Sequence, residues 1–218
     1  MHVTPIGVIR TPYASKYDAP RQPGADDRSH DAVIELDANQ NFEQAVHDLE
    51  GFTHVWVIAW FHRAGGWKPK VLPPRSRVKR GLFATRSPHR PNPIGISVVR
   101  LLRIEGRMIH VNGVDLLDGT PILDIKPYLA YADAIVDAGG GWTVEADERP
   151  RYDVVWQCSS PENDFRTHVE RVLSADPFPH PYRRIKQHPE LGYVLAVRDR
   201  RVQFIVRDSV VVVVAITP

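Results

Sequence analysis

Short apolar runs separated by polar turns make up most of the N-terminal half of the chain, and this pattern predicts strands. The first candidates are residues 3–10, 32–37 and 54–61. The last of these, HVWVIAWF, is nearly continuous in β-branched and aromatic residues, which is typical of a buried strand. Residues 94–117 predict a hairpin that turns at 105–107. Strands do not alternate with helices here, which argues against a doubly wound nucleotide-binding fold.

One stretch of this half has helical spacing. In residues 41–52, four apolar side chains recur at helical intervals before Gly51, a residue typical of helix ends. Residues 121–129 and 152–157 are shorter strand candidates. No glycine-rich dinucleotide fingerprint or phosphate loop is found, so the common nucleotide-binding motifs are excluded.

The C-terminal part has a different pattern. Residues 137–151 are rich in glycine and charge, which predicts a linker, and residues 161–177 predict an amphipathic helix. Three further apolar stretches predict strands at 193–199, 201–208 and 210–217. We therefore expect a mainly β protein with a first domain at 1–150 and a small α+β domain at 151–218.

Composition narrows the class of protein. The chain has 218 residues, of which 43% are hydrophobic, enough for one sizeable core and a smaller one. The single cysteine, Cys158, cannot form an internal disulfide, and no Cys/His spacing predicts a metal site. The first residues lack the pattern of a signal peptide, and the apolar run at 210–216 is too short to span a bilayer. We expect a cytoplasmic protein with no membrane partner.

Charge is strongly segregated along the chain. Residues 63–107 hold twelve Lys or Arg and one acid, Glu105, which is a balance of +11. Residues 183–207 hold seven Lys or Arg against two acids, a balance of +5. Such stretches suggest a polyanionic partner, most often nucleic acid. The alternative is a solvated surface whose counter-charges, gathered between residues 115 and 153, fold alongside.

The stretch GLFATRSPHRPNPIGIS at residues 81–97 is both cationic and rigid. Its prolines restrict the backbone, so the loop has little conformational entropy left to lose. Arg86 and Arg90 then project guanidinium groups that bind carboxylate or phosphate bidentately. Gly95 permits close approach of another backbone. The alternative is a stiff surface loop with incidental arginines.

Three other stretches carry candidate polar groups. Residues 9–13 end in a turn with a tyrosine, residues 53–54 lie at the start of a buried strand, and residues 113–128 contain three aspartates near a Gly-Thr-Pro turn. Each has a structural alternative: a tyrosine that caps a core, a satisfied histidine, and a common Asp-Gly turn pair.

Together these motifs resemble one family. The stretches IGVIRTPY, FTHVWVIAWFH, GLFATRSPHRPNPIGIS and LLDGTPILDIKPY resemble, in this order, the TrmO/YaeB family of bacterial tRNA N6-methyltransferases. The resemblance is strong over residues 3–135, and the segment from ADPFPHPYRR onward is similar to the family's C-terminal extension. It implies a β-barrel domain of the TsaA-like type, distinct from Rossmann-type methyltransferases, and a homodimer.

The resemblance also implies site residues. Cofactor contacts would come from three short segments and from the two arginines of the rigid loop: Thr11, Pro12, Tyr13, Thr53, His54, Arg86, Arg90, Asp115, Leu116, Leu117, Asp118, Gly119 and Thr120. The ring of Tyr13 is a candidate to stack on the adenine. Asp118 and His54 are both candidates to accept a proton during catalysis, and the sequence does not rank them.

The function implied by the resemblance is methyl transfer from S-adenosylmethionine to N6 of threonylcarbamoyladenosine, position 37 of tRNA. Two other functions stay open on the sequence, a non-catalytic RNA-binding module and an S-adenosylmethionine sensor. For a tRNA partner, the basic stretches supply the expected phosphate contacts: Lys68, Lys70, Arg75, Arg77, Lys79, Arg80, Arg183, Arg184 and Lys186. We expect the segment 63–80 to bind tRNA rather than the cofactor.

Overall fold

The computed structural model of the chain forms two compact units. It describes residues 2–17, 19–20, 30–74, 76–144, 151–159, 161–180 and 184–218. The first unit comprises Met1–Pro73 and Arg77–Ala138, and the second comprises Pro74–Ser76 and Gly139–Pro218. The predicted domain boundary at residue 150 lies outside the described residues and stays a prediction.

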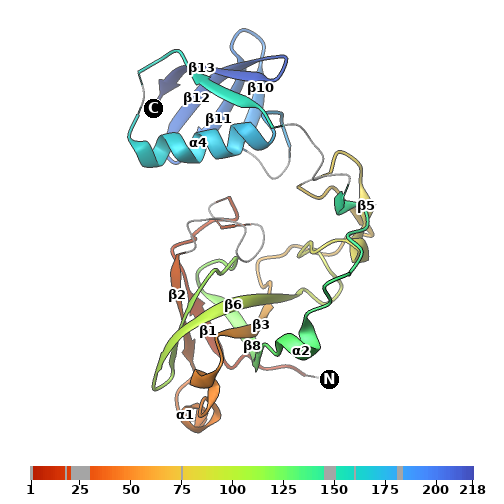
Figure 1. The fold of residues 1–218 in the computed structure, drawn as a ribbon, viewed down its shortest axis with the longest axis vertical. Helices are drawn as coiled ribbons and strands as arrows, with labels where there is room; N and C mark the ends of the chain where they lie inside the picture. Colours follow the sequence, from red (N-terminus) through yellow and green to blue (C-terminus); the bar gives the residue numbers. More distant parts are fainter. Residues whose placement is uncertain are drawn as a thin grey trace. The chain divides into compact units, whose positions relative to one another are not determined.

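The first unit is a closed barrel of six strands, each antiparallel to its neighbours (Figure 1). Around the barrel the strands follow the order β1 (Gly7–Arg10), β2 (Asp31–Leu36), β7 (Met108–Asn112), β6 (Ile94–Glu105), β3 (His54–Trp60) and β8 (Thr120–Pro127). Closure pairs every strand on both sides, so the backbone groups of the wall are satisfied without free edges.

Alternation of side chains explains why these sequences form a barrel. Val55, Val57 and Ala59 of β3 have no exposed surface and fill the interior. Trp56 and Trp60 point to the outside, where Trp56 is half-buried and Trp60 is exposed. The predicted strand at 54–61 and the predicted hairpin with its turn at 105–107 are both found.

Strand register defines the two ends of the barrel. Ile9 of β1 pairs with Thr120 at the start of β8, and Ala59 near the end of β3 pairs with Ile122. The segments after β1, after β3 and before β8 therefore meet at one end, which we call the mouth. His54 lies at the opposite end, where the amide of Tyr128 donates to its carbonyl oxygen.

The predicted helix at 41–52 is wrong in length. The structure has a four-residue helix α1 (Phe42–Ala45) and a separate 3-10 turn η1 (Leu49–Gly51). Asp48, between them, has a φ of 65°, and this left-handed backbone conformation cannot continue a helix. A further short helix, α2 (Ala130–Asp133), follows β8.

The rigid loop predicted at 81–97 is part of a small lobe beside the barrel. A two-stranded sheet of β4 (Lys70–Val71) and β5 (Arg80–Gly81) leads into the 3-10 turn η2 (Leu82–Ala84), which precedes the proline-rich segment. We call residues 63–73 and 77–93 the basic lobe. The lobe returns to the barrel at β6, where a Cβ on Gly95 would lie 2.4 Å from Cζ of Phe61. Gly95 therefore permits the close approach of a side chain, which explains the glycine at that position.

The second unit is a five-stranded sheet with one helix. The sheet order is β10 (Ile185–His188), β11 (Gly192–Val197), β12 (Arg200–Arg207), β13 (Val210–Thr217) and β9 (Asp153–Trp156), and β9 is parallel to β13. The mainly β prediction, with a barrel and a small α+β part, is confirmed.

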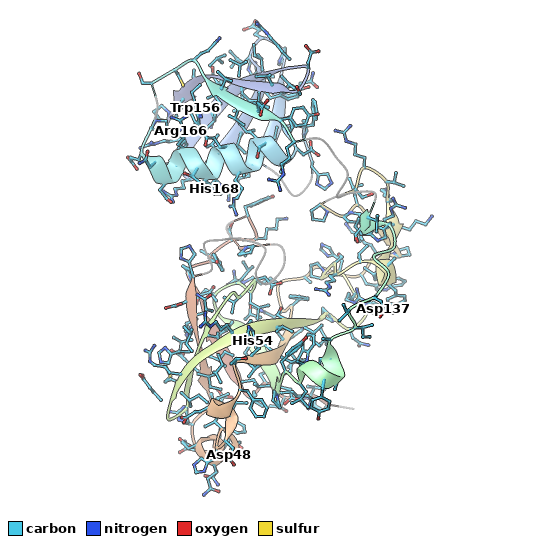
Figure 2. The ribbon with its side chains drawn as sticks, viewed as in Figure 1. Asp48, His54, Asp137, Trp156, Arg166 and His168 are labelled. Carbon is cyan, nitrogen blue, oxygen red and sulfur yellow. The ribbon has the colours of Figure 1, made fainter. Side chains whose placement is uncertain are left out.

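Helix α4 (Asn163–Ala175) covers one face of this sheet (Figure 1). Its predicted apolar face is found, because Phe165, Val169 and Leu173 are at most 2% exposed and pack in the core of the second unit. A polar contact also joins the helix to the sheet: the indole N–H of Trp156 donates to Glu170 over 2.8 Å (Figure 2). Among the helices that the structure describes, none is long and apolar enough to cross a membrane.

Candidate functional site

Hydrogen bonds join two of the predicted cofactor segments at the mouth of the barrel. The backbone N–H of Thr11 donates to Oδ1 of Asp118 over 3.1 Å, and the Thr11 hydroxyl donates to the carbonyl oxygen of Leu116 over 3.1 Å. In return, the amide of Asp118 donates to the carbonyl oxygen of Tyr13 over 2.9 Å. Segments more than 100 residues apart in sequence thus form one rigid structure.

The turn that follows holds the Asp118 carboxylate in place. Gly119 has a φ of 72°, a conformation that favours glycine, and its amide donates to the carbonyl oxygen of Ile9. The hydroxyl of Thr120 donates to the carbonyl oxygen of Leu117 over 2.7 Å. Of the Asp118 carboxylate oxygens, only Oδ1 has a hydrogen bond in the described part of the chain, so Oδ2 is available to a ligand.

A second carboxyl group lies at the same end of the barrel. The hydroxyl of Ser97, which is 4% exposed on the inner face of β6, donates to Oδ1 of Asp115 over 2.6 Å. Burial raises the pKa of the Asp115 carboxyl, and the bond from Ser97 together with the charge of Arg86 opposes that rise. Arg86 therefore acts electrostatically on Asp115, which brings the rigid loop into the site.

Arg63 adds a cation to the mouth. Its guanidinium donates to the carbonyl oxygen of Ala14 over 3.3 Å and to that of Asp118 over 3.4 Å. Arg63 thus contacts both joined segments. Arg63 therefore lies at the candidate site and also within the segment 63–80 that is predicted to bind tRNA.

The two signature arginines have different environments. One guanidinium nitrogen of Arg90 donates to the carbonyl oxygen of Thr85 over 2.9 Å and is 3.5 Å from that of Leu82, so Arg90 stabilises the fold of its own loop. Arg86 is the one whose charge acts on Asp115 at the mouth. Of the two, Arg86 is the stronger candidate for a ligand contact.

Tyr13 does not present its ring at the mouth. The side chain is 5% exposed and belongs to the barrel core, so the predicted stacking of an adenine on this ring does not fit the structure. The backbone of Tyr13 still contributes, because its carbonyl oxygen accepts the bond from Asp118. Pro12, beside it, is exposed.

Thr53 and His54 are not brought to the mouth within one chain. The Thr53 hydroxyl lies 3.0 Å from Nδ1 of His54, and the His54 ring packs edge-on against Tyr128. Strand β8 runs extended from Thr120 at the mouth to Pro127 beside this pair, a span of roughly 20 Å at about 3.3 Å per residue. His54 and Asp118 of one chain therefore cannot contact the same small ligand.

The donor set at the mouth fits a zwitterionic nucleoside. Asp115 and Asp118 suit an ammonium group or ribose hydroxyls, and Arg63 and Arg86 suit a carboxylate. The amides of Asp118 and Gly119 already donate to Tyr13 and Ile9, so a base edge would pair with other backbone groups of residues 116–119. S-adenosylmethionine has all of these groups. Among the described residues, no cluster of three or more His, Cys, Asp or Glu could hold a metal ion.

Sequence reasoning missed Ser97 and Arg63 as parts of the site. The sequence did carry a signal for Ser97. It is a polar residue at an inward-facing position of β6, in an alternation whose next inward residue is Val99. A buried hydroxyl requires a hydrogen-bond partner, so Ser97 indicated a polar site. Arg63 had no such signal, because its place at the mouth depends on the pairing of β3 with β8.

The fold and the mouth define a β-barrel protein with a polar site for a small charged ligand. The family described as tRNA-methyltransferase O N-terminal domain matches residues 8–134. The tRNA (adenine(37)-N6)-methyltransferase of Escherichia coli (strain K12) is 36% identical over 98% of this chain and 96% of its own length. An S-adenosyl-L-methionine-binding protein of Archaeoglobus fulgidus is 40% identical over 62% of this chain and 94% of its own length.

A solved structure agrees with these relatives. The crystal structure of TrmO from Pseudomonas aeruginosa is 34% identical, with a TM-score of 0.62, and the match covers 100% of this chain and 98% of that one. The chain belongs to the TrmO family of tRNA methyltransferases, as the motifs of its sequence indicate.

Asp115 gives the site a testable pH dependence. Because its pKa is raised in the folded state, ionising the carboxyl destabilises the fold as pH rises from the ordinary aspartate range towards the raised pKa. Asp115→Asn keeps an acceptor for Ser97 and removes this effect. We expect its free energy of unfolding in urea to rise relative to the parent protein across that window and to stay level above it.

Asp124→Asn is the matched control for the loss of one carboxylate from the barrel, since Asp124 is paired with Lys126 on the exposed surface. A difference between Asp115→Asn and the parent protein that does not vary with pH contradicts the assignment.

Proposed function

We propose that this protein methylates N6 of threonylcarbamoyladenosine at position 37 of tRNA, with S-adenosylmethionine bound at the mouth of its barrel. The observation that carries the proposal is the joined pair of segments, in which Asp118 bonds to Thr11 and Tyr13 and keeps one carboxylate oxygen for a ligand. The coarser activity, N6 methylation of adenine 37 in tRNA, is the named activity of the E. coli relative, which matches this chain almost end to end.

The chain's own residues have distinct roles in holding the cofactor. Asp115, oriented by Ser97, is proposed to bind the ammonium group or a ribose hydroxyl, and Arg86 the carboxylate. Backbone groups of residues 116–119 are proposed to read the adenine edge, apart from the amides of Asp118 and Gly119, which already donate within the fold. The Archaeoglobus relative, named as an S-adenosylmethionine-binding protein, matches little more than half of this chain, which supports a binding site within a single domain.

The chemistry asks little of the protein beyond alignment and one proton transfer. S-adenosylmethionine supplies a methyl group that is already activated by its attachment to a sulfonium. The rigid mouth holds the acceptor nitrogen in line with that methyl group. N6 loses its proton as the new N–C bond forms, and Oδ2 of Asp118 is the proposed acceptor.

The threonylcarbamoyl group supports this choice of substrate in two ways. It withdraws electrons from N6, which eases loss of the proton. It also carries a free carboxylate, which needs a cation near the reacting nitrogen. Arg63, at the mouth beside Asp118, is proposed to provide it.

Asp118→Asn tests the function directly. Asn is nearly isosteric and its side-chain oxygen can still accept from Thr11, so the mouth should stay folded while the proton acceptor is lost. We expect single-turnover transfer of tritiated methyl from S-adenosylmethionine to tRNA to fall by roughly 10²-fold or more. The parent protein is assayed with unmodified tRNA and with threonylcarbamoylated tRNA as substrates. If it transfers methyl to neither tRNA, the proposed function is refuted. Full activity of the variant would remove Asp118 from the reaction.

The basic lobe is the proposed contact for tRNA phosphates. Lys68, Lys70 and Lys79 are exposed and have no ion-pair partner among the residues that the structure describes. Two other predicted contacts, Arg75 and Arg183, lie outside the described residues. Exposed unpaired cations on one lobe are the pattern that favours backbone binding to nucleic acid.

Replacing Lys68, Lys70 and Lys79 by Ser should raise the KM for tRNA. The slope of log K against log salt should become shallower by about one for each lysine that no longer neutralises a phosphate. The control is a triple Ser variant at three cations that each have a carboxylate partner: Arg103, Lys126 and Arg198. Equal slopes for the two variants would show that net charge, and not the lobe, determines binding.

We propose in addition that the protein acts as a homodimer in the cytoplasm, where tRNA is modified. The separation of Thr53 and His54 from the mouth supports a second copy, because a partner can bring this pair to the other chain's ligand. Exposed apolar side chains on the outer face of β3 and β6 also support it: Trp60 at 43%, Ile94 at 46% and Ile96 at 56% exposed. Light scattering should give twice the mass of one chain, and a monomer at assay concentrations would contradict this.

A further inference from the structure

An exposed aromatic ring stands on the basic lobe with no role in the core or at the mouth. Phe83 is 78% exposed, far more than a large apolar side chain needs to be in a folded domain. It lies in η2, between the paired strands β4 and β5 and the proline-rich segment. Single exposed apolar residues are common, so the case for a partner depends on how this ring is supported and on what lies beside it.

The backbone under this ring is held firmly. Leu82, the residue before it, is 3% exposed, and its amide donates to the carbonyl oxygen of Pro69 over 3.0 Å. The carbonyl oxygen of Leu82 accepts from both the amide and the hydroxyl of Thr85, over 3.0 and 2.8 Å. Phe83 is therefore presented outward on a preorganised turn.

A cation lies beside the ring. The guanidinium carbon of Arg90 is 5.4 Å from the centre of the Phe83 ring, and the same group is fixed by its bond to the carbonyl oxygen of Thr85. A guanidinium near an aromatic ring gives a surface that is both flat and positive. That combination suits a nucleobase with its phosphate, since bases stack on aromatic rings and on arginine planes.

The surroundings favour RNA over a protein partner. The sequence has no Asp or Glu from residue 63 to residue 104, so the lobe repels cationic surfaces and attracts anionic ones. The amide of Lys68 donates to the carbonyl oxygen of His89, which ties the lysine-bearing strand of the lobe to the proline-rich segment. Trp67, the neighbour of Lys68, is a second exposed ring at 57%.

We propose that Phe83, with Arg90 beside it, is a stacking platform for an unpaired base of the RNA substrate. The platform would hold one nucleotide of the anticodon loop while the adjacent target is at the mouth. This rests on the proposed function for the identity of the RNA, and it adds a base contact to a surface otherwise assigned to phosphates.

Four variants of the full chain test the platform by their affinity for an anticodon stem-loop RNA. We expect Phe83→Ala and Phe83→Leu to weaken binding roughly 5- to 100-fold, the scale of removing one base stack, whereas Phe83→Trp keeps it. The salt dependence of binding should stay unchanged, because stacking releases no counterions. Tyr131→Ala is the control, since Tyr131 is an 88% exposed aromatic residue outside the lobe.

Abasic RNAs identify the base. When the base at one loop position is removed, that RNA should bind Phe83→Ala and the parent protein equally well, while the other abasic RNAs keep the difference. If Phe83→Leu binds the stem-loop RNA with the same affinity as the parent protein, the platform is overturned. So does an altered mass in light scattering with unchanged RNA affinity, which would assign Phe83 to a contact between copies.

Failure of the platform and failure of the proposed function give different results. Methyl transfer by the parent protein is measured in parallel. If the parent protein methylates tRNA and Phe83→Leu binds RNA as tightly as the parent does, the platform alone is rejected. Loss of RNA affinity in Phe83→Leu, with no transfer by the parent protein, supports the platform and rejects the proposed reaction.

Discussion

The reciprocal bonding between Asp118 and the segment from Thr11 to Tyr13 is the interaction on which the rest of the mouth depends. One carboxylate oxygen accepts a backbone N–H, and the aspartate's own amide donates back to the other segment. The same residue therefore shapes the mouth and keeps one carboxylate oxygen without a hydrogen bond among the described residues. A group held in this way needs little reorganisation when a ligand arrives, which is the condition for efficient catalysis by alignment.

Charge at the mouth is balanced rather than uniform. Asp115 accepts a hydrogen bond from the Ser97 hydroxyl and one from the backbone, and the charge of Arg86 acts on it from the rigid loop. Arg63, which follows β3 at the same end of the barrel, contacts both segments. A zwitterionic ligand can satisfy both signs of charge at once, whereas a simple anion or cation would leave one sign unmatched. The site thus selects for ligands that carry both.

The sequence predicted the parts of the fold that follow from local patterns. Alternation and β-branched content located β3, the hairpin of β6 and β7, and helix α4. The helix at 41–52 failed because Asp48 adopts a left-handed backbone, which apolar spacing does not reveal. The motifs located the candidate site segments but not how they come together, because the strand register that separates His54 from Asp118 is a long-range property.

The seam of the barrel also fixes the order in which the protein can form. Strand β1 pairs with β8 through Ile9 and Thr120, so the wall cannot close until the chain has been made at least as far as β8. Contacts between residues so distant in sequence are slow to form, because a long loop must be closed before they stabilise anything. Thr11 and Asp118 flank that seam. The mouth is therefore completed in the same step that closes the barrel, so a chain that lacks a closed wall also lacks the site.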